Sequence, residues 1–308
     1  MKRPRNTPIL IAGPTASGKS ALAVALAREL GGVVINADSM QVYAELRILT
    51  ARPTDEELAQ APHALYGHVP AAEAYSVARW LGDVERALGE AAKRDQVPII
   101  VGGTGLYFRA LLDGLSPVPA IPPDVRARWR GEAAAVGAAE LHRQLDARDP
   151  VMAQRLSPTD TQRIVRALEV FDATGRSLAE WQAISGSPLV DAASARTIAL
   201  TPDRGALSAR ADARFEAMMR AGALDEVRAL AALRLDRALP AIGALGVRPL
   251  MACLAGQCTL DDAVAAGKLE TRHYIKRQQT WARRYMLGWK ASATPDVGEV
   301  LFLLRSNV

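Results

Sequence analysis

The chain has 308 residues, enough for one large domain or two smaller ones with a substantial core. Hydrophobic residues make up 49% and charged residues 23%, the balance of an ordinary soluble globular protein. The two cysteines, Cys253 and Cys258, form neither a CxxC pair nor a cysteine–histidine cluster, which argues against a zinc site or a disulfide framework. The first apolar run breaks at Gly13 and is too short for a signal peptide or a membrane span. We therefore expect a cytoplasmic protein without a membrane partner.

The formal net charge of +5 is unevenly distributed. Between Lys268 and Lys290 there are seven Lys or Arg residues and one acidic residue, Glu270. Such a stretch is either a nucleic-acid contact or a solvated helix face, and the charge alone leaves both interpretations open.

The first third of the chain alternates between predicted strands and helices. Short apolar runs predict buried strands at 8–12, 33–37 and 97–101, and helical periodicity predicts helices at 21–30 and 76–93. This alternation predicts an α/β fold with a mostly parallel sheet and helices on both faces. Ligands of such sheets bind at the carboxyl ends of the strands. We therefore expect the glycine-rich segment 13–20, Asp38 and Thr104 to converge.

The pattern changes at residues 116–123, where four prolines prevent a helix or a sheet strand. The following residues, up to about Ser194, are interpreted as an all-helical insertion. Residues 197–200 are predicted to return to the sheet as a strand, and helices are expected at 203–235, 247–254 and 260–285. The expected domains are a core of residues 1–115 and 196–308 and a helical insertion of residues 116–195.

The strongest motif is a P-loop, with the spacing GxxxxGK[ST]. Its glycines allow consecutive backbone N–H groups to point at phosphate oxygens, and the helix that follows adds its positive end. Lys19 supplies a charge, and the hydroxyl of Ser20 can hold Mg²⁺. The predicted phosphate-binding residues are Gly13, Pro14, Thr15, Ala16, Ser17, Gly18, Lys19 and Ser20.

Asp38 follows the second predicted strand, so it could be a metal ligand, a catalytic base or a helix N-cap. The third strand ends in Gly102-Gly103-Thr104, without the acidic residue that many P-loop ATPases place there. An ATP-driven motor is therefore disfavoured, and a group-transfer enzyme fits better.

Two further segments carry polar and cationic residues. Residues 160–170 form an amphipathic pattern that predicts a core-facing side with Ile164, Leu168 and Val165. Gln162, Arg163 and Arg166 lie along another side. Residues 276–285 mix cations, amides and aromatics, which suits phosphate contacts and base stacking. The same pattern also suits a helix whose Trp281 and Tyr285 pack inward, and the physical pattern slightly favours packing.

Taken together, these motifs resemble the bacterial tRNA dimethylallyltransferases, also called tRNA isopentenyltransferases. The resemblance extends along almost the whole chain. It is carried by residues 13–20, 38–43, 50–54, 62–63, 75–76, 102–107, 162–170, 222–227, 246–248 and 276–283.

The resemblance implies transfer of a dimethylallyl group from dimethylallyl diphosphate to the exocyclic N6 amine of the adenosine 3′-adjacent to the tRNA anticodon. Diphosphate leaves, and Mg²⁺ is the expected cofactor. The expected partners are the anticodon stem-loop of tRNA and the allylic diphosphate, and the enzyme is expected to be a monomer. ATP is expected to be able to compete for the P-loop, whose amides recognise phosphate.

The resemblance also implies roles for single residues. Lys19 and Arg214 would stabilise the leaving diphosphate, Asp38 would act as general base, and Thr104 would contact the target nucleotide. The target base would be flipped out of its stack to reach the site. The residues expected to contact tRNA are Asp38, Ser39, Met40, Gln41, Thr104, Arg126, Gln162, Arg163, Ile164, Val165, Arg166, Gly243, Arg248, Lys276, Arg277, Gln278, Gln279, Thr280, Trp281, Ala282 and Arg283.

Some positions depart from the family pattern: Ser20 replaces a commoner threonine, Met40 an arginine, Leu49 a glycine and Val247 a tyrosine. Two other functions compete with this interpretation. A P-loop kinase for small molecules would phosphorylate an acceptor without tRNA, and an RNA-binding protein with a vestigial P-loop would have no activity. The intact Lys19, Ser20 and Asp38 argue against the second of these.

Overall fold

The computed structural model describes residues 7–305 and contains a six-stranded sheet whose neighbouring strands are all parallel. The strand order is β3-β2-β4-β1-β5-β6, with β1 at the centre between β4 and β5. Within this sheet Ile11 is paired with Val101 on one side and with Ile198 on the other. The strands are β1 (Ile9–Ala12), β2 (Gly32–Asn36), β3 (His63–Ala64), β4 (Val97–Gly102), β5 (Arg196–Leu200) and β6 (Lys290–Ser292).

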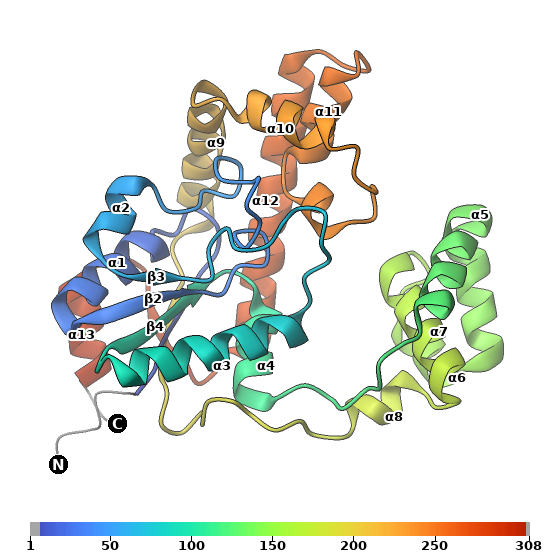
Figure 1. The fold of residues 1–308 in the computed structure, drawn as a ribbon, viewed down its shortest axis with the longest axis horizontal. Coiled ribbons are helices and arrows are strands. Elements are labelled where there is room, and N and C mark those ends of the chain that lie inside the picture. The colour runs from blue at the N-terminus through green and yellow to red at the C-terminus, as the bar shows by residue number, and fades with distance from the viewer. Residues whose placement is uncertain (1–6, 306–308) are drawn as a thin grey trace. The chain divides into compact units, whose positions relative to one another are not determined.

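Helices cover both faces of the sheet (Figure 1). In the part of the chain that contains the sheet, the helices are α1 (Lys19–Leu30), α2 (Asp55–Gln60), α3 (Val77–Lys93), α4 (Gly105–Asp113), α9 (Arg204–Arg220), α10 (Ala223–Ala232), the 3₁₀ helix η1 (Pro240–Gly243), α11 (Val247–Leu254), α12 (Leu260–Tyr285) and α13 (Val297–Arg305).

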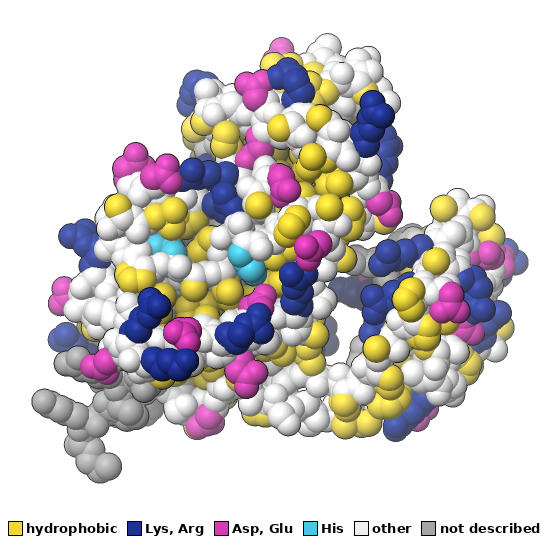
Figure 2. Space-filling model, in the orientation of Figure 1, with side chains coloured by type: hydrophobic (Ala, Val, Ile, Leu, Met, Phe, Trp, Pro, Cys, Tyr) yellow, Lys and Arg dark blue, Asp and Glu magenta, His cyan; other side chains and the backbone are white. Residues whose placement is uncertain are grey.

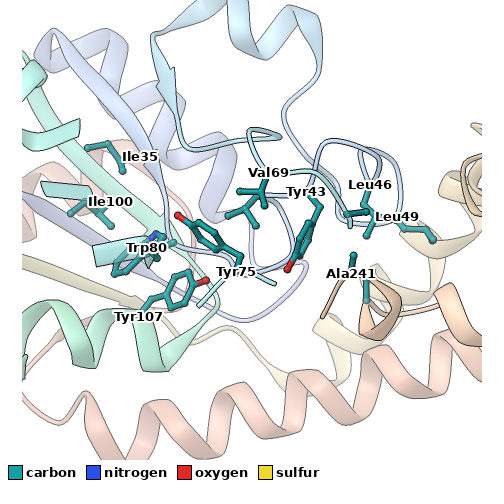
Figure 3. Close-up of a cluster of buried hydrophobic side chains, with 14 of the residues drawn as sticks. Ile35, Tyr43, Leu46, Leu49, Val69, Tyr75, Trp80, Ile100, Tyr107 and Ala241 are labelled. Carbon is teal, nitrogen blue, oxygen red and sulfur yellow. The ribbon is translucent and has the colours of Figure 1, made fainter. Parts of the chain in front are cut away.

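Side chains alternate between two cores because successive strand residues point to opposite faces. Ile9 and Ile11 pack on one face with apolar residues of α1 and α13. Leu10, Ile35 and Ile100 belong to the core of the other face, which extends through Trp80 of α3. Figure 3 shows this second core, in which the fully buried Tyr43 and Leu46 connect the sheet region to Ala241 in η1. The sheet is therefore buried on both sides, which explains its continuous apolar strands.

A second compact unit, residues 113–188, is all helical. Its helices are α5 (Pro123–Arg148), α6 (Pro150–Arg155), α7 (Thr161–Thr174) and α8 (Leu178–Gln182). They enclose a core of their own that includes Trp129, Leu141, Leu145, Ile164 and Leu168. Figure 2 shows Lys and Arg side chains intermingled with acidic ones over the visible face of this unit. Its sequence has nine arginines and ten acidic residues, so the positive excess of the chain lies in the other unit.

The structure confirms the predicted α/β class, with its parallel sheet, its covering helices and its helical insertion. The predicted helix 203–235 is instead two helices, because Gly222 adopts a left-handed conformation with φ 99° between them. Residues 183–195 contain no helix. The backbone N–H groups of Leu189 and Val190 donate to the carbonyl of Leu111, so these residues belong to the unit that contains the sheet. In residues 7–305 no helix is both long and apolar enough to span a membrane.

Candidate active site

The P-loop connects β1 to α1 and presents unpaired backbone donors. Gly18 precedes α1 with φ 86° and no side-chain cap. The N–H groups of Gly18, Lys19 and Ser20 have no hydrogen-bond acceptor among the described residues. Free N–H groups at the positive end of a helix form an anion-binding site. The local geometry therefore supports the binding of a phosphate group.

Asp38 lies just beyond β2 and is fixed by its neighbour Asn36. The buried Asn36 side chain accepts from the N–H of Asp38 (2.8 Å) and donates to the carbonyl of Asp38 (2.9 Å). One carboxylate oxygen of Asp38 accepts from the N–H of Met40 at 2.9 Å. No helix begins here, so the N-cap interpretation of Asp38 is wrong. These bonds fix the backbone of Asp38 and one of its carboxylate oxygens. The second carboxylate oxygen is free to accept a hydrogen bond or a proton.

Asn36 was not singled out by the sequence analysis, although a signal was present. An amide in an apolar strand must find partners when it is buried. The Asn36 amide finds them in Asp38 and in the carbonyl of Leu65 (3.0 Å), while the indole N–H of Trp80 donates to the backbone carbonyl of Asn36 at 2.8 Å.

Thr104, beyond β4, is joined to the segment that follows Asp38. Its hydroxyl accepts from the N–H of Ser39 at 3.0 Å, and its own N–H donates to the carbonyl of Ala37 at 3.3 Å. The hydroxyl of Thr104 also donates to the hydroxyl of Ser39 at 3.3 Å. The ends of β1, β2 and β4 thus converge as expected.

A cavity of about 220 Å³ lies where these strand ends meet. Its walls combine the P-loop, the Asp38 segment, α9 and α12. The residues that line it include Thr15, Lys19, Asp38, Ser39, Met40, Gln41, Arg214, Gly243, Tyr274 and Arg277. Six of the residues expected to contact tRNA therefore border the same cavity as the P-loop lysine.

Charges inside this cavity are strongly coupled. Burial lowers the pKa of Lys19 from 10.5 to about 8, the negative charge of Asp38 partly restores it, and Arg214 lowers it further. Burial also lowers the pKa of Arg214, an effect that Asp38 opposes. The ammonium of Lys19 donates to the carbonyl of Pro14 in its own loop at 3.3 Å. Two cations around a cavity at a helix N-terminus create a site that favours a multiply charged anion.

A larger cavity of about 550 Å³ borders the P-loop at Gly13 and Pro14 and lies against other residues of α12. Its apolar wall is formed by Phe108, Leu200, Trp281, Met286, Leu287 and Trp289. Gln278 also lines this cavity. The P-loop therefore contributes to two neighbouring cavities, one charged and one largely apolar.

The residues expected to contact tRNA on α12 have several different environments. Trp281 packs so closely on Gly105 that a Cβ at Gly105 would lie 2.3 Å from its ring. Tyr285 is 42% exposed, so the interpretation that it packs inward is wrong, although its ring lies 4.8 Å from that of Trp281. The amide of Gln278 contacts the P-loop, accepting from the N–H of Thr15 at 2.9 Å.

In the helical unit the expected contacts are divided between surface and core. Ile164 is fully buried and Val165 is 9% exposed, so both side chains face the core, as the amphipathic pattern predicted. They hold α7 in the core of the unit. Gln162 and Arg163 are exposed, and Arg163 forms an ion pair with Asp160 at 2.7 Å. Arg166 is paired with Glu169 at 3.4 Å, and Arg126 and Arg248 are exposed on their helices.

Comparisons with known proteins match nearly the whole chain to one family of transferases. The IPP transferase family matches residues 41–285, and the isopentenyl transferase family matches residues 7–66. A tRNA dimethylallyltransferase of Parvibaculum lavamentivorans is 53% identical over 294 residues, covering 96% of this chain and 93% of that protein. One from Nitrobacter hamburgensis is 55% identical over 278 residues, covering 90% and 88%.

Solved structures show the same fold. The tRNA isopentenylpyrophosphate transferase of Bacillus halodurans superimposes with a TM-score of 0.68 at 31% identity, covering 97% of this chain and 94% of that one. A eukaryotic dimethylallyltransferase acting on tRNA gives a TM-score of 0.74 at 28% identity, with coverage of 89% and 69%.

Proposed function

We propose that this chain, which belongs to the IPP transferase family of tRNA dimethylallyltransferases, transfers a dimethylallyl group from dimethylallyl diphosphate to tRNA. The acceptor is the exocyclic N6 amine of the adenosine 3′-adjacent to the anticodon, and diphosphate is released. One observation carries the proposal beyond family membership. A carboxylate, a P-loop lysine and a partly buried arginine border a single cavity at the ends of the parallel strands.

The donor diphosphate binds to the free N–H groups at the start of α1, with Lys19 and Arg214 beside it. The N6 nitrogen attacks the first carbon of the allyl group while the bond from that carbon to the diphosphate oxygen breaks. The electron pair of the broken bond leaves with the diphosphate, where fixed N–H dipoles and two cations stabilise the growing negative charge. Stabilisation of the leaving group is therefore the first task of the P-loop.

Asp38 is assigned the second task, general-base catalysis. An adenine amine is a weak nucleophile because its lone pair is delocalised into the ring, so removal of its proton during bond formation assists the reaction. The carboxylate oxygen of Asp38 that is not bonded to Met40 is available to accept this proton. Thr104, whose hydroxyl accepts from the N–H of Ser39, would contact the flipped base, and Tyr274 borders the same cavity as Asp38.

The donor atoms around the P-loop fit a Mg²⁺ ion. Mg²⁺ is commonly bound by one or two protein oxygens together with phosphate oxygens and water. The hydroxyl of Ser20, at the start of α1, provides such an oxygen, whereas no cluster of three His, Cys, Asp or Glu residues occurs within residues 7–305. When bound there with the diphosphate, the ion would neutralise part of its negative charge.

Recognition of tRNA is assigned to three groups of exposed side chains. Lys276, Arg277 and Arg283 on α12 and Arg248 on α11 would contact phosphates, and Arg126, Gln162 and Arg163 would do so from the helical unit. We further propose that the enzyme acts as a monomer in the cytoplasm, where its tRNA substrate is found. ATP would compete with the donor because the P-loop amides recognise phosphate and not the group attached to it.

The decisive experiment incubates the protein with an anticodon stem-loop RNA, Mg²⁺ and dimethylallyl diphosphate, followed by mass spectrometry of the nucleosides. We expect one adenosine to gain a dimethylallyl group. A parallel reaction contains ATP and a nucleoside monophosphate instead. A phosphorylated product in the second reaction and unmodified RNA in the first would establish a kinase and refute the proposal.

Replacing Asp38→Asn tests the general base without changing the size of the side chain. We expect kcat to fall by about 10²–10⁴-fold, the usual contribution of a positioned base, while the Kd for the stem-loop changes little. Glu85→Gln, an exposed change on α3, serves as the control. Unimpaired turnover of Asp38→Asn would exclude the role of Asp38 as a base.

A further inference from the structure

The P-loop contains one residue whose backbone conformation needs outside support. Ala16 has φ 63°, in the left-handed region that L-amino acids other than glycine disfavour. Such a conformation persists only where the surrounding structure holds it in place. Ala16 lies between the two glycines of the phosphate-binding motif, so its conformation helps determine where the N–H groups of Gly18 and Lys19 point.

Two side chains from distant helices hold the backbone on either side of Ala16. On α12 the amide of Gln278 accepts from the N–H of Thr15 at 2.9 Å. The same amide donates to the carbonyl of Gly103 at 3.0 Å and thereby ties the loop to the end of β4. On α9 the Nε of Arg210 donates to the carbonyl of Ala16 at 3.1 Å.

The side chain of Ala16 is anchored as well. Its methyl group packs against a small buried cluster of Leu207, Ala211 and Ile275, which come from α9 and α12. The two helices are joined near this cluster by an ion pair between Arg272 and Asp212 at 3.1 Å. A glycine at position 16 would relieve the backbone strain but would lose this methyl contact. The contact therefore compensates for part of the strain that an alanine has at this position.

The position of Gln278 is close-fitting. A Cβ at Gly103 would lie 2.2 Å from the amide nitrogen of Gln278, so the amide can approach only because residue 103 is a glycine. This packing commits Gln278 to the P-loop and the end of β4, with its amide oxygen and one amide N–H both engaged there.

We propose that Gln278 and Arg210 are positioning residues that hold Ala16 in its left-handed conformation and so preform the phosphate cradle. The inference rests on the proposed function, since the cradle is taken to bind the donor diphosphate. Without these contacts Ala16 relaxes toward ordinary backbone conformations, and only a fraction of molecules present a competent loop. The apparent Kd for diphosphate rises in inverse proportion to that fraction.

The size of the effect follows from the intrinsic preference of an L-residue against this conformation, which corresponds to a factor of about 5–30 in population. We therefore expect Gln278→Met, which keeps the length of the side chain but removes its amide, to weaken binding of inorganic diphosphate by about tenfold. Arg210→Met should weaken it by about three- to tenfold. Gln257→Met and Arg220→Met, both at exposed positions, are the matched controls and should bind diphosphate like the wild type.

The distinguishing measurement repeats both substitutions in an Ala16→Gly background, using titration calorimetry with inorganic diphosphate and Mg²⁺. Glycine adopts a positive φ without cost, so the two residues should no longer matter there. We expect each substitution to change the Kd by less than about twofold in that background. The Kd for a stem-loop RNA should be unchanged by Gln278→Met, and thermal melting confirms that each variant is folded.

Three results would overturn the inference. One is wild-type diphosphate affinity in Gln278→Met, and another is an equally large loss in the Ala16→Gly background, which would indicate direct contact with the ligand. The third is a loss of RNA affinity alone, which would make Gln278 a tRNA contact. A wild-type protein that does not bind diphosphate would overturn the proposed function as well, so the two failures are distinguishable.

Discussion

The lowered pKa of Lys19 predicts that binding of the donor weakens steeply in mild alkali. Lys19 is charged below its pKa of about 8 and neutral above it. At pH 7.5 about three quarters of the molecules carry the ammonium, and at pH 9.5 about 3% do. The phosphate groups of the donor titrate near pH 6 and are already ionised over this range. If the bound state requires the charged lysine, the Kd for dimethylallyl diphosphate increases about 25-fold between these two pH values.

Titration calorimetry in buffers of different ionisation enthalpy measures both the affinity and the proton uptake. A bound anion favours the ammonium and raises its pKa, so binding at pH 8 should take up about half a proton per site. Lys19→Met should bind weakly, with no pH dependence in this range. In Asp38→Asn the decline should begin at lower pH, because the charge of Asp38 raises the pKa of Lys19.

A Kd that is constant from pH 7.5 to 9.5 would exclude any need for the charged lysine in donor binding. The same decline in Lys19→Met would show that another group is responsible for the pH dependence.

Two further predictions concern α12. Gly105→Ala places a Cβ 2.3 Å from the ring of Trp281 and should lower the free energy of unfolding, measured by chemical denaturation, by about 1–3 kcal/mol. The control Gly89→Ala meets no atom within 4 Å and should not destabilise the protein. Equal effects of the two substitutions would contradict the close packing of Trp281 on Gly105. Replacing Lys276 and Arg277 by glutamine should reduce the slope of log Kd for stem-loop RNA against log salt by about 1–2. The same change at the exposed Lys93 and Arg94 should leave that slope intact, and an unchanged slope in the first variant would make α12 a packing helix.

Much of the fold could be predicted because its signals are local in the chain. The apolar runs of β1, β2 and β4, the P-loop spacing and the caps of α3 depend on residues that are neighbours in sequence. Elements with weak local signals were missed. The strand β3 has two residues and β6 has three, and each forms because a neighbouring strand offers it a ladder.

The sequence by itself determined that a P-loop, an aspartate and a threonine each follow a strand. Because parallel strands end at one edge of a sheet, these three features could be predicted to lie close together. Only the tertiary structure decided which distant side chains serve that edge. The partner of Thr15 is Gln278, 263 residues away, and the partner of Ala16 is Arg210, 194 residues away. Periodicity reports which face of a helix is buried, whereas a hydrogen bond between helices depends on how those faces pack. The sequence therefore located the phosphate site, and the packing of α9 and α12 determined how that site is held in shape.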